Sequence, residues 1–210
     1  MRDELKDNLK TKSFFIGISL GSNTNYDSSF AVLDKDLNII SIDKFYTVED
    51  LELILKNFTS SDNAIFCVSM PEDMTLLDGK WRIHAKNYKM LDDTFKINRH
   101  NWTNRISMRA NDLLLQYKNK GTIIYRYDVA QLRMSYGLEP IFPIRSSSDC
   151  KSFQDSLRLK YNFRLLPDNM LPASNLEALL GALFAYDISK GIEINNVCEI
   201  GGLDVLFKVI

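Results

Sequence analysis

The amino-acid sequence predicts an α/β fold built on a mixed sheet, and three observations lead to it. Phe14 to Leu20 is apolar almost without a break, which is typical of a central strand covered on both faces. Two further strand-like runs follow it across short polar turns. A helical stretch and another apolar run come next. We therefore expect five or six strands, an antiparallel meander plus parallel strands, with helices on both faces.

The first predicted helix follows the meander and precedes the fourth strand. The strands after the first are expected at Ser28 to Leu33, Leu37 to Phe45 and Ala64 to Met70. Residues 48–58 carry apolar side chains at helical spacing, and Thr47 with Asp50 is spaced as a cap pair at the start of this helix.

The second half of the chain predicts further helices and strands around a long insertion. Residues 71–103 show no clear periodicity and are expected to form an irregular insertion. The predicted helices are 104–117, a short one capped by Asp128, 150–163 and 172–189. The predicted strands are Thr122 to Tyr127 and Leu203 to Ile210, the latter entered through Gly201 and Gly202.

Composition and charge are those of an ordinary globular protein. The chain has 210 residues, of which 45% are hydrophobic and 25% charged, so we expect an N-terminal arm at 1–12 and a single domain at 13–210. The net charge of -1 gives no overall attraction to nucleic acid or acidic lipid. Three widely spaced cysteines and the lack of an apolar leader or membrane span indicate a cytoplasmic protein with no membrane partner.

Four short motifs, in order, carry a family resemblance. They read GISLGSN, VSMPE, WRIHAKN and SNLEALLGALFA, and the similarity extends over Phe14 to Ile210. The chain resembles the ribonuclease H-like superfamily, in particular the predicted nucleases catalogued as domain of unknown function 429. The resemblance implies a ribonuclease H-like fold. It places the expected site residues on Ser19, Ser69, Arg82 and either Glu177 or Asn175.

The chain departs from this family where acidic residues are expected. In ribonuclease H-like enzymes, carboxylates at strand ends hold divalent metal ions that activate water. Here Ser19 and Ser69 are neutral, and the fifth strand reads Tyr125-Arg126-Tyr127. Glu177 is the acid that remains, so Ser19, Ser69 and Glu177 are expected to be relics of a catalytic site. We therefore expect neither a metal ligand set nor a cofactor.

Two alternatives concern the acidic residues. Loop acids could rebuild a magnesium or manganese site; the candidates are Asp27, Asp73 and Asp78. Glu177 also has a purely structural interpretation, because it follows Ser174 by three positions at a helix start, and this spacing is that of a capping box.

The residues from Lys80 to Arg109 form the one local concentration of positive charge. We call them the basic window; it holds eight lysines and arginines, two aspartates, both tryptophans and both histidines. Nucleic-acid surfaces combine cations for phosphates with rings that stack on unpaired bases. The candidate nucleic-acid-binding residues are Trp81, Arg82, His84, Arg99, Trp102 and Arg105. The alternative is a solvated face whose tryptophans belong to the core.

Three functions follow as expectations. The first is a catalytically degenerate nuclease-family domain that binds nucleic acid, or another phosphate-bearing partner, through the basic window. The second is an active metal-dependent nuclease with a rearranged site. The third is a protein-interaction or scaffold domain, which a stable homo-oligomer without affinity for oligonucleotides would favour.

Overall fold

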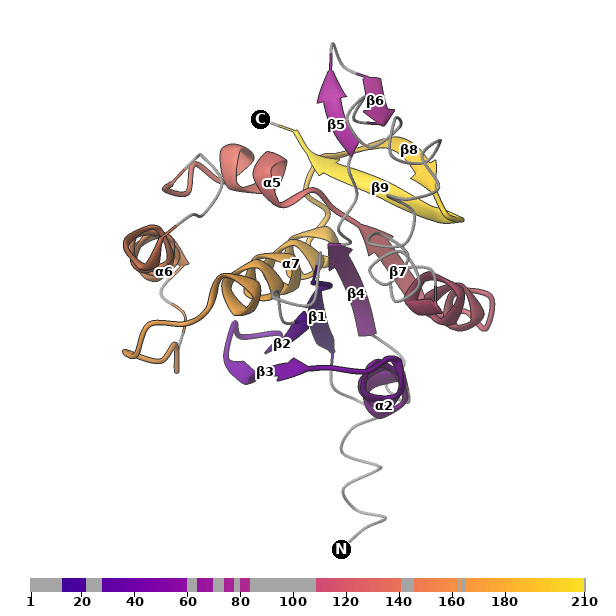
Figure 1. Cartoon of the computed structure of the whole chain (residues 1–210), viewed down its shortest axis with the longest axis horizontal. Coiled ribbons are helices and arrows are strands. Elements are labelled where there is room, and N and C mark those ends of the chain that lie inside the picture. The colour runs from indigo at the N-terminus through magenta and orange to yellow at the C-terminus, as the bar shows by residue number, and fades with distance from the viewer. Residues whose placement is uncertain are drawn as a thin grey trace, which may run out of the picture.

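The computed structural model describes residues 13–21, 28–59, 64–69, 74–77, 80–83, 109–140, 146–161, 163 and 165–209. Its main element is a seven-stranded mixed sheet in the order β3-β2-β1-β4-β7-β9-β8 (Figure 1). The strands are β1 (Phe14–Ser19), β2 (Ser28–Asp34), β3 (Ile39–Phe45), β4 (Ala64–Ser69), β7 (Ile123–Arg126), β8 (Ile194–Ile200) and β9 (Leu203–Lys208).

The predicted meander and central strand are confirmed. β2 pairs antiparallel with both β1 and β3, whereas β4 pairs parallel with β1, and β7 parallel with β4. All six residues of β1 are buried, because β1 lies inside the sheet and carries helices over both faces.

The expected number of five or six strands is wrong, because β8 adds a seventh to the main sheet. β8 pairs antiparallel with β9 at one edge, and β9 pairs parallel with β7. Several β8 side chains, among them Asn195, Asn196 and Glu199, are exposed. Apolar and polar residues do not alternate along β8, so this edge strand gives a weak sequence signal. The turn into β9 uses Gly201 and Gly202, both at positive φ, as the sequence predicts.

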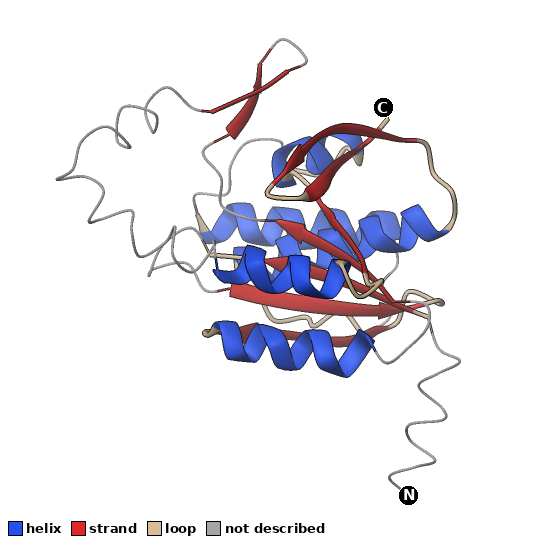
Figure 2. Ribbon diagram, turned by 90° about the vertical axis from the view of Figure 1, so that its right-hand side faces the viewer, coloured by secondary structure: helices blue, strands red, loops and turns tan. Residues whose placement is uncertain are grey.

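Helices cover both faces of the sheet (Figure 2). On one face lie α5 (Val129–Ser135), α6 (Ser147–Tyr161) and α7 (Ala173–Ser189), which enclose one buried cluster. On the other face lie α2 (Val48–Thr59) and a helix over residues 109–118, which enclose a second. None of the described helices is long and apolar enough to cross a membrane.

Local capping explains where two of these helices begin. The Thr47 hydroxyl accepts from the Asp50 amide, and the Asp50 carboxylate accepts from the Thr47 amide, both at 3.0 Å, so the predicted cap pair of α2 is confirmed. Ser146 and Asp149 form the same reciprocal pair before α6. This pair starts α6 at Ser147, three residues earlier than the sequence periodicity suggests.

The insertion at 71–103 contains regular structure where irregular structure is expected. β5 (Met74–Leu77) and β6 (Lys80–Ile83) form a two-stranded antiparallel sheet. Four-residue strands are too short to show a clear alternation in sequence. The rest of the insertion lies outside the described residues, as does the arm at 1–12.

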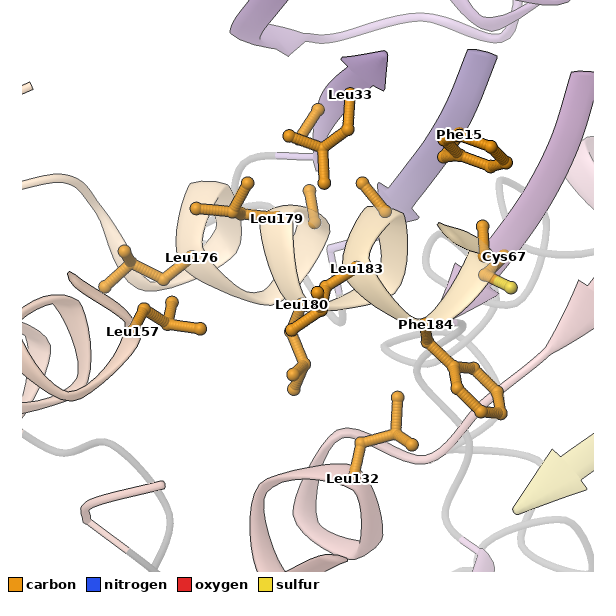
Figure 3. Packing of buried hydrophobic residues seen from close by; sticks show 14 of the residues in the cluster. Phe15, Leu33, Cys67, Leu132, Leu157, Leu176, Leu179, Leu180, Leu183 and Phe184 are labelled. Atoms are coloured by element: carbon orange, nitrogen blue, oxygen red, sulfur yellow. The ribbon is translucent and has the colours of Figure 1, made fainter. Parts of the chain in front are cut away.

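α7 is the central helix of the molecule, as its apolar sequence predicts. It packs against β1, β2 and β4, and its buried leucines and Phe184 meet side chains of the sheet, α5 and α6 (Figure 3). The side chains around it include Phe15, Leu33, Cys67, Leu132 and Leu157. This packing fixes which part of the sheet the first turn of α7 reaches.

Candidate functional site

Polar residues gather where the central parallel strands end. β1 and β4 are in register, so Ser19 and Ser69 are direct neighbours at their last positions. β7 runs in the same direction, and Asp128 follows its end as the N-cap of α5. Because the carboxyl ends of parallel strands meet at one edge of a sheet, these residues share that edge. We call it the carboxyl edge.

Glu177 reaches the carboxyl edge from the first turns of α7. The Ser19 hydroxyl donates a hydrogen bond of 2.9 Å to Oε2 of Glu177. Ser19 is 3% exposed and Glu177 is partly buried. Two positions that the family resemblance singles out, 158 residues apart in the chain, are therefore in direct contact.

The capping-box interpretation of Ser174 and Glu177 is wrong. α7 begins at Ala173 after Pro172, and no side chain forms a capping hydrogen bond at its start. The Ser174 hydroxyl instead lies 2.9 Å from Oγ of Ser29, and the Glu177 carboxylate accepts from Ser19. The α7 side chains bind the sheet because α7 starts directly over it, and sequence spacing alone does not contain that information.

Glycine lets α7 approach the sheet this closely. A Cβ on Gly17 of β1 would lie 1.8 Å from the carbonyl oxygen of Ala178 and 2.3 Å from the amide nitrogen of Ala182. Backbone of α7 thus fills the space that a side chain at position 17 would need. Gly181 serves the same purpose for Tyr127, whose hydroxyl would lie 2.6 Å from a Cβ there.

A second polar contact joins β2 to α7 beside the first. Ser29 pairs directly with Ser19 across β1 and β2 and is fully buried. Its hydroxyl donates to Oδ1 of Asn175 at 2.7 Å. Asn175, the second candidate for the family position in this helix, therefore binds the sheet one strand away from Glu177. Buried polar groups paired in this way fix one register of helix on sheet.

The Glu177 carboxyl has a pKa above its ordinary value. Burial is the main cause, because it disfavours the charged form. The hydrogen bond from Ser19 and the positive charge of Arg133 oppose the shift, and the negative charge of Asp128 adds to it. The carboxyl edge thus contains an acid whose proton is held more tightly than that of a solvated glutamate.

Asp128 is a site residue that the sequence identifies only as a helix cap. It does cap α5, since Oδ1 accepts from the Gln131 amide at 2.7 Å. Burial also raises the pKa of the Asp128 carboxyl, although hydrogen bonds to α5 amides oppose the shift. Its position directly after a buried strand that is parallel to β4 could have indicated an edge residue.

Tyr127 ties the end of β7 to the same turn of α7. Its hydroxyl donates to the Glu177 carbonyl oxygen at 2.7 Å, and its side chain is 4% exposed. This bond holds Glu177 next to the segment that carries Asp128. The sequence predicts Tyr127 only as the last residue of a strand.

The side chains at this edge do not fit the metal site of a ribonuclease H-like nuclease. Ser19 and Ser69 are neutral, and each carboxylate already accepts a hydrogen bond, from Ser19 at Glu177 and from the Gln131 amide at Asp128. Within the described residues, no group of three or more histidine, cysteine, aspartate or glutamate side chains could hold a metal ion. Asp27, Asp73 and Asp78 lie outside those residues.

Most of the basic window also lies outside the described residues. Trp81 and Arg82 belong to β6, whose backbone alone is described. His84, Arg99, Trp102 and Arg105 are not described, so their place relative to the carboxyl edge stays a prediction. Arg109, the last residue of the window, forms an exposed ion pair of 3.0 Å with Glu49.

No family model and no curated protein matches this chain.

Proposed function

We propose that this chain is a ribonuclease H-like domain that binds single-stranded nucleic acid, or another phosphate-bearing partner, without hydrolysing it. The order of the central strands supports the fold part of this proposal. An antiparallel β1-β2-β3 meander continues into the parallel strands β4 and β7, with helices on both faces. This is the arrangement that the resemblance implies.

The contact between Ser19 and Glu177 supports the part of the proposal that concerns the absence of hydrolysis. In the related nucleases the corresponding positions hold carboxylates that bind metal ions. Here a neutral hydroxyl donates to the remaining carboxyl, which is partly buried and has a raised pKa. A carboxyl group in that state is a weak ligand for a magnesium ion, because metal binding requires the ionised form.

The composition of the basic window supports a nucleic acid, or another phosphate-bearing partner, as the ligand. Eight lysines and arginines, two tryptophans and two histidines fall within thirty positions of a chain whose net charge is -1. The rest of the chain is correspondingly acidic and would repel a phosphate backbone. Binding should therefore use the window, with cations at the phosphates and aromatic rings stacked on unpaired bases.

A salt titration of oligonucleotide binding tests this function. We expect a labelled single-stranded oligonucleotide to bind at low salt, and the affinity to fall steeply as salt rises. The Arg82→Ala, Arg99→Ala, Arg105→Ala triple variant should bind more weakly and with a shallower salt dependence. The charge-matched control replaces three cations outside the window, Lys35, Lys56 and Lys151, with alanine and should bind as the wild type does. Equal binding by both triple variants would overturn the proposal.

Asp128 favours one second candidate function, a metal-dependent nuclease with a rearranged site. It supplies a second carboxyl group at the edge that carries Glu177, and its charge influences that of Glu177. This alternative requires that the protein cleaves a nucleic acid in the presence of magnesium or manganese. The Glu177→Gln substitution should abolish that cleavage. A protein-interaction domain is the outcome if the chain neither binds nor cleaves oligonucleotides.

A further inference from the structure

β3 is an edge strand of the main sheet, and its side that faces away from β2 has no strand partner among the described residues. We call this side the outer edge of β3. A strand edge of this kind presents N–H and C=O groups to which another strand can add. At the opposite end of the sheet, β6 lies close to β8. The outer edge of β3 is therefore the place where strand addition to this sheet has to be considered.

The hydrogen bonding of the sheet determines which groups of β3 face outward. The Leu20 amide, directly after β1, donates to the carbonyl oxygen of Ser69 at the end of β4. Even-numbered positions of β1 thus face β4, and odd-numbered positions face β2. Through the registers of β1 with β2 and of β2 with β3, the backbone groups of Asp43 face β2. Those of Ile42 and Lys44 on either side of it therefore face the outer edge.

Two carboxylates already bind backbone amides along this edge. The Lys44 amide donates to Oδ1 of Asp43 at 2.8 Å, and the Tyr46 amide donates to Oδ2 of Asp50 at 3.1 Å. Near the other end of β3, the register with β2 skips Ile40, which forms a bulge. An added strand would have to displace these carboxylates and follow an irregular backbone, so few positions remain for it.

The charge of Asp43 acts specifically against a second copy of this chain. In an antiparallel pair, residues whose backbone groups face outward pair with one another. The register that uses both Ile42 and Lys44 of each copy pairs Ile42 with Lys44 and places the two Asp43 residues directly opposite each other. The Cα atoms of such a pair are about 4.5 Å apart. Asp43 is exposed, and like charges directly opposite each other destabilise a strand pair.

We propose that Asp43 prevents a second copy of the chain from adding to the outer edge of β3, and that it does so in two ways. Its carboxylate binds the Lys44 amide that the added strand would need. Its negative charge repels the same residue of the second copy across the twofold axis. Without this carboxylate, two copies should join at β3 and form one continuous sheet. This inference does not depend on whether the chain binds nucleic acid.

Sedimentation equilibrium at a series of protein concentrations tests the proposal. Asp43→Thr removes the carboxylate and introduces a residue that strands favour, so its mass should rise reversibly toward twice that of the wild type. The charge-matched control, Asp36→Thr, changes an exposed aspartate in the turn before β3 and should keep the mass of the wild type. Adding Lys44→Pro to Asp43→Thr removes an outward-facing N–H. It should restore the mass of the wild type, because an edge strand tolerates proline at such a position.

Three results would overturn the proposal. Asp43→Thr could keep the mass of the wild type at every concentration, its association could persist after Lys44→Pro is added, or Asp36→Thr could associate equally. Circular dichroism of each variant checks that it is folded. If Asp43→Thr does not fold, Asp43→Ala takes its place, because it also removes the carboxylate, and the same three results decide.

Discussion

At the scale of single residues, the carboxyl edge is defined by short polar contacts to α7. Ser19 binds the Glu177 side chain, Tyr127 binds the Glu177 carbonyl and Ser29 binds Asn175. Each contact satisfies a polar group that is buried or partly buried. Together they hold one acid at the end of the central strands, and its protonation and neighbours can be tested by substitution.

The first prediction concerns the protonation of Glu177. Its pKa is raised in the folded state, mainly by burial, so the folded protein binds this proton more tightly than the unfolded chain does. The resulting stabilisation is complete below the pKa of the unfolded chain and is lost as the pH rises through the folded-state pKa. Wild type should therefore lose stability relative to Glu177→Gln between acidic and neutral pH, as urea unfolding at a series of pH values measures.

Ser19→Ala provides the internal control for that experiment. The Ser19 hydroxyl lowers the pKa of Glu177, so its removal should move the pH-dependent loss of stability to higher pH. If the stability difference between wild type and Glu177→Gln does not change with pH, Glu177 does not titrate as its environment indicates.

A second prediction concerns the hydroxyl of Tyr127. Tyr127→Phe removes a buried hydrogen bond of 2.7 Å to α7 and should lower the free energy of unfolding by about 1 kcal/mol. The matched control is Tyr125→Phe on β7, two residues earlier in the chain. The Tyr125 hydroxyl forms no hydrogen bond with the part of the chain that is described. Chemical denaturation of both variants gives the comparison, and equal losses would contradict a specific role for the Tyr127 bond.

At the scale of elements, α7 and the strand beneath it depend on each other. The helix lies close enough for its first turns to reach Ser19 because β1 carries glycine at position 17. The site geometry is thus a consequence of one backbone contact between α7 and β1.

The third prediction tests this contact. A methyl group at Gly17 would overlap α7 backbone at 1.8 Å, and rigid backbone on both sides leaves little room to relax. Gly17→Ala should lower the free energy of unfolding by at least about 3 kcal/mol or prevent folding. The control is Gly121→Ala, where a Cβ meets no atom within 4 Å and only the positive φ is strained, at a cost of about 1 kcal/mol. Thermal or urea unfolding measures both; a Gly17→Ala loss no larger than that of Gly121→Ala would contradict close packing.

The elements with strong local signals could be predicted from the sequence. β1 and α7 are almost wholly apolar, and α2 begins at a reciprocal cap pair. The local sequence of each element is therefore enough to predict it. β8 could not be predicted, because its pairing with β9 stabilises a strand whose apolar and polar residues do not alternate. Strand pairing is a long-range property that local composition reports poorly.

The candidate site could be predicted only in part for the same reason. The resemblance singles out Ser19 and Glu177, and the structure brings them together. Asp128 reaches the site because it follows the end of β7 and β7 pairs with β4, and local sequence does not show that pairing. The capping-box spacing at Ser174 even favours a different role for Glu177.

At the scale of the whole molecule, charge is divided between two regions. A chain of net charge -1 carries eight lysines and arginines between Lys80 and Arg109. Such a division favours an orientation in which that segment faces a polyanion and the acidic remainder faces solvent. The carboxyl edge, which carries Glu177 and Asp128, should then take no part in phosphate binding.

The fourth prediction follows from that division. For single strands, the logarithm of the affinity falls with the logarithm of the salt concentration by about 0.7 for each neutralised phosphate. If Arg82, Arg99 and Arg105 each contact one phosphate, their combined replacement by alanine should reduce this slope by about 2. Fluorescence anisotropy at several salt concentrations measures the slope, and an unchanged slope would place the phosphate contacts elsewhere.

The central claim is that the domain holds nucleic acid without cutting it. One incubation tests it most directly: a labelled single-stranded oligonucleotide is mixed with the protein and manganese, and the bound and the full-length fractions are read together over time. We predict a bound fraction that falls as salt rises and an oligonucleotide that stays full length. Two results would contradict the claim. One is cleavage of the full-length strand by the wild type but not by Glu177→Gln, and the other is the absence of binding at low salt.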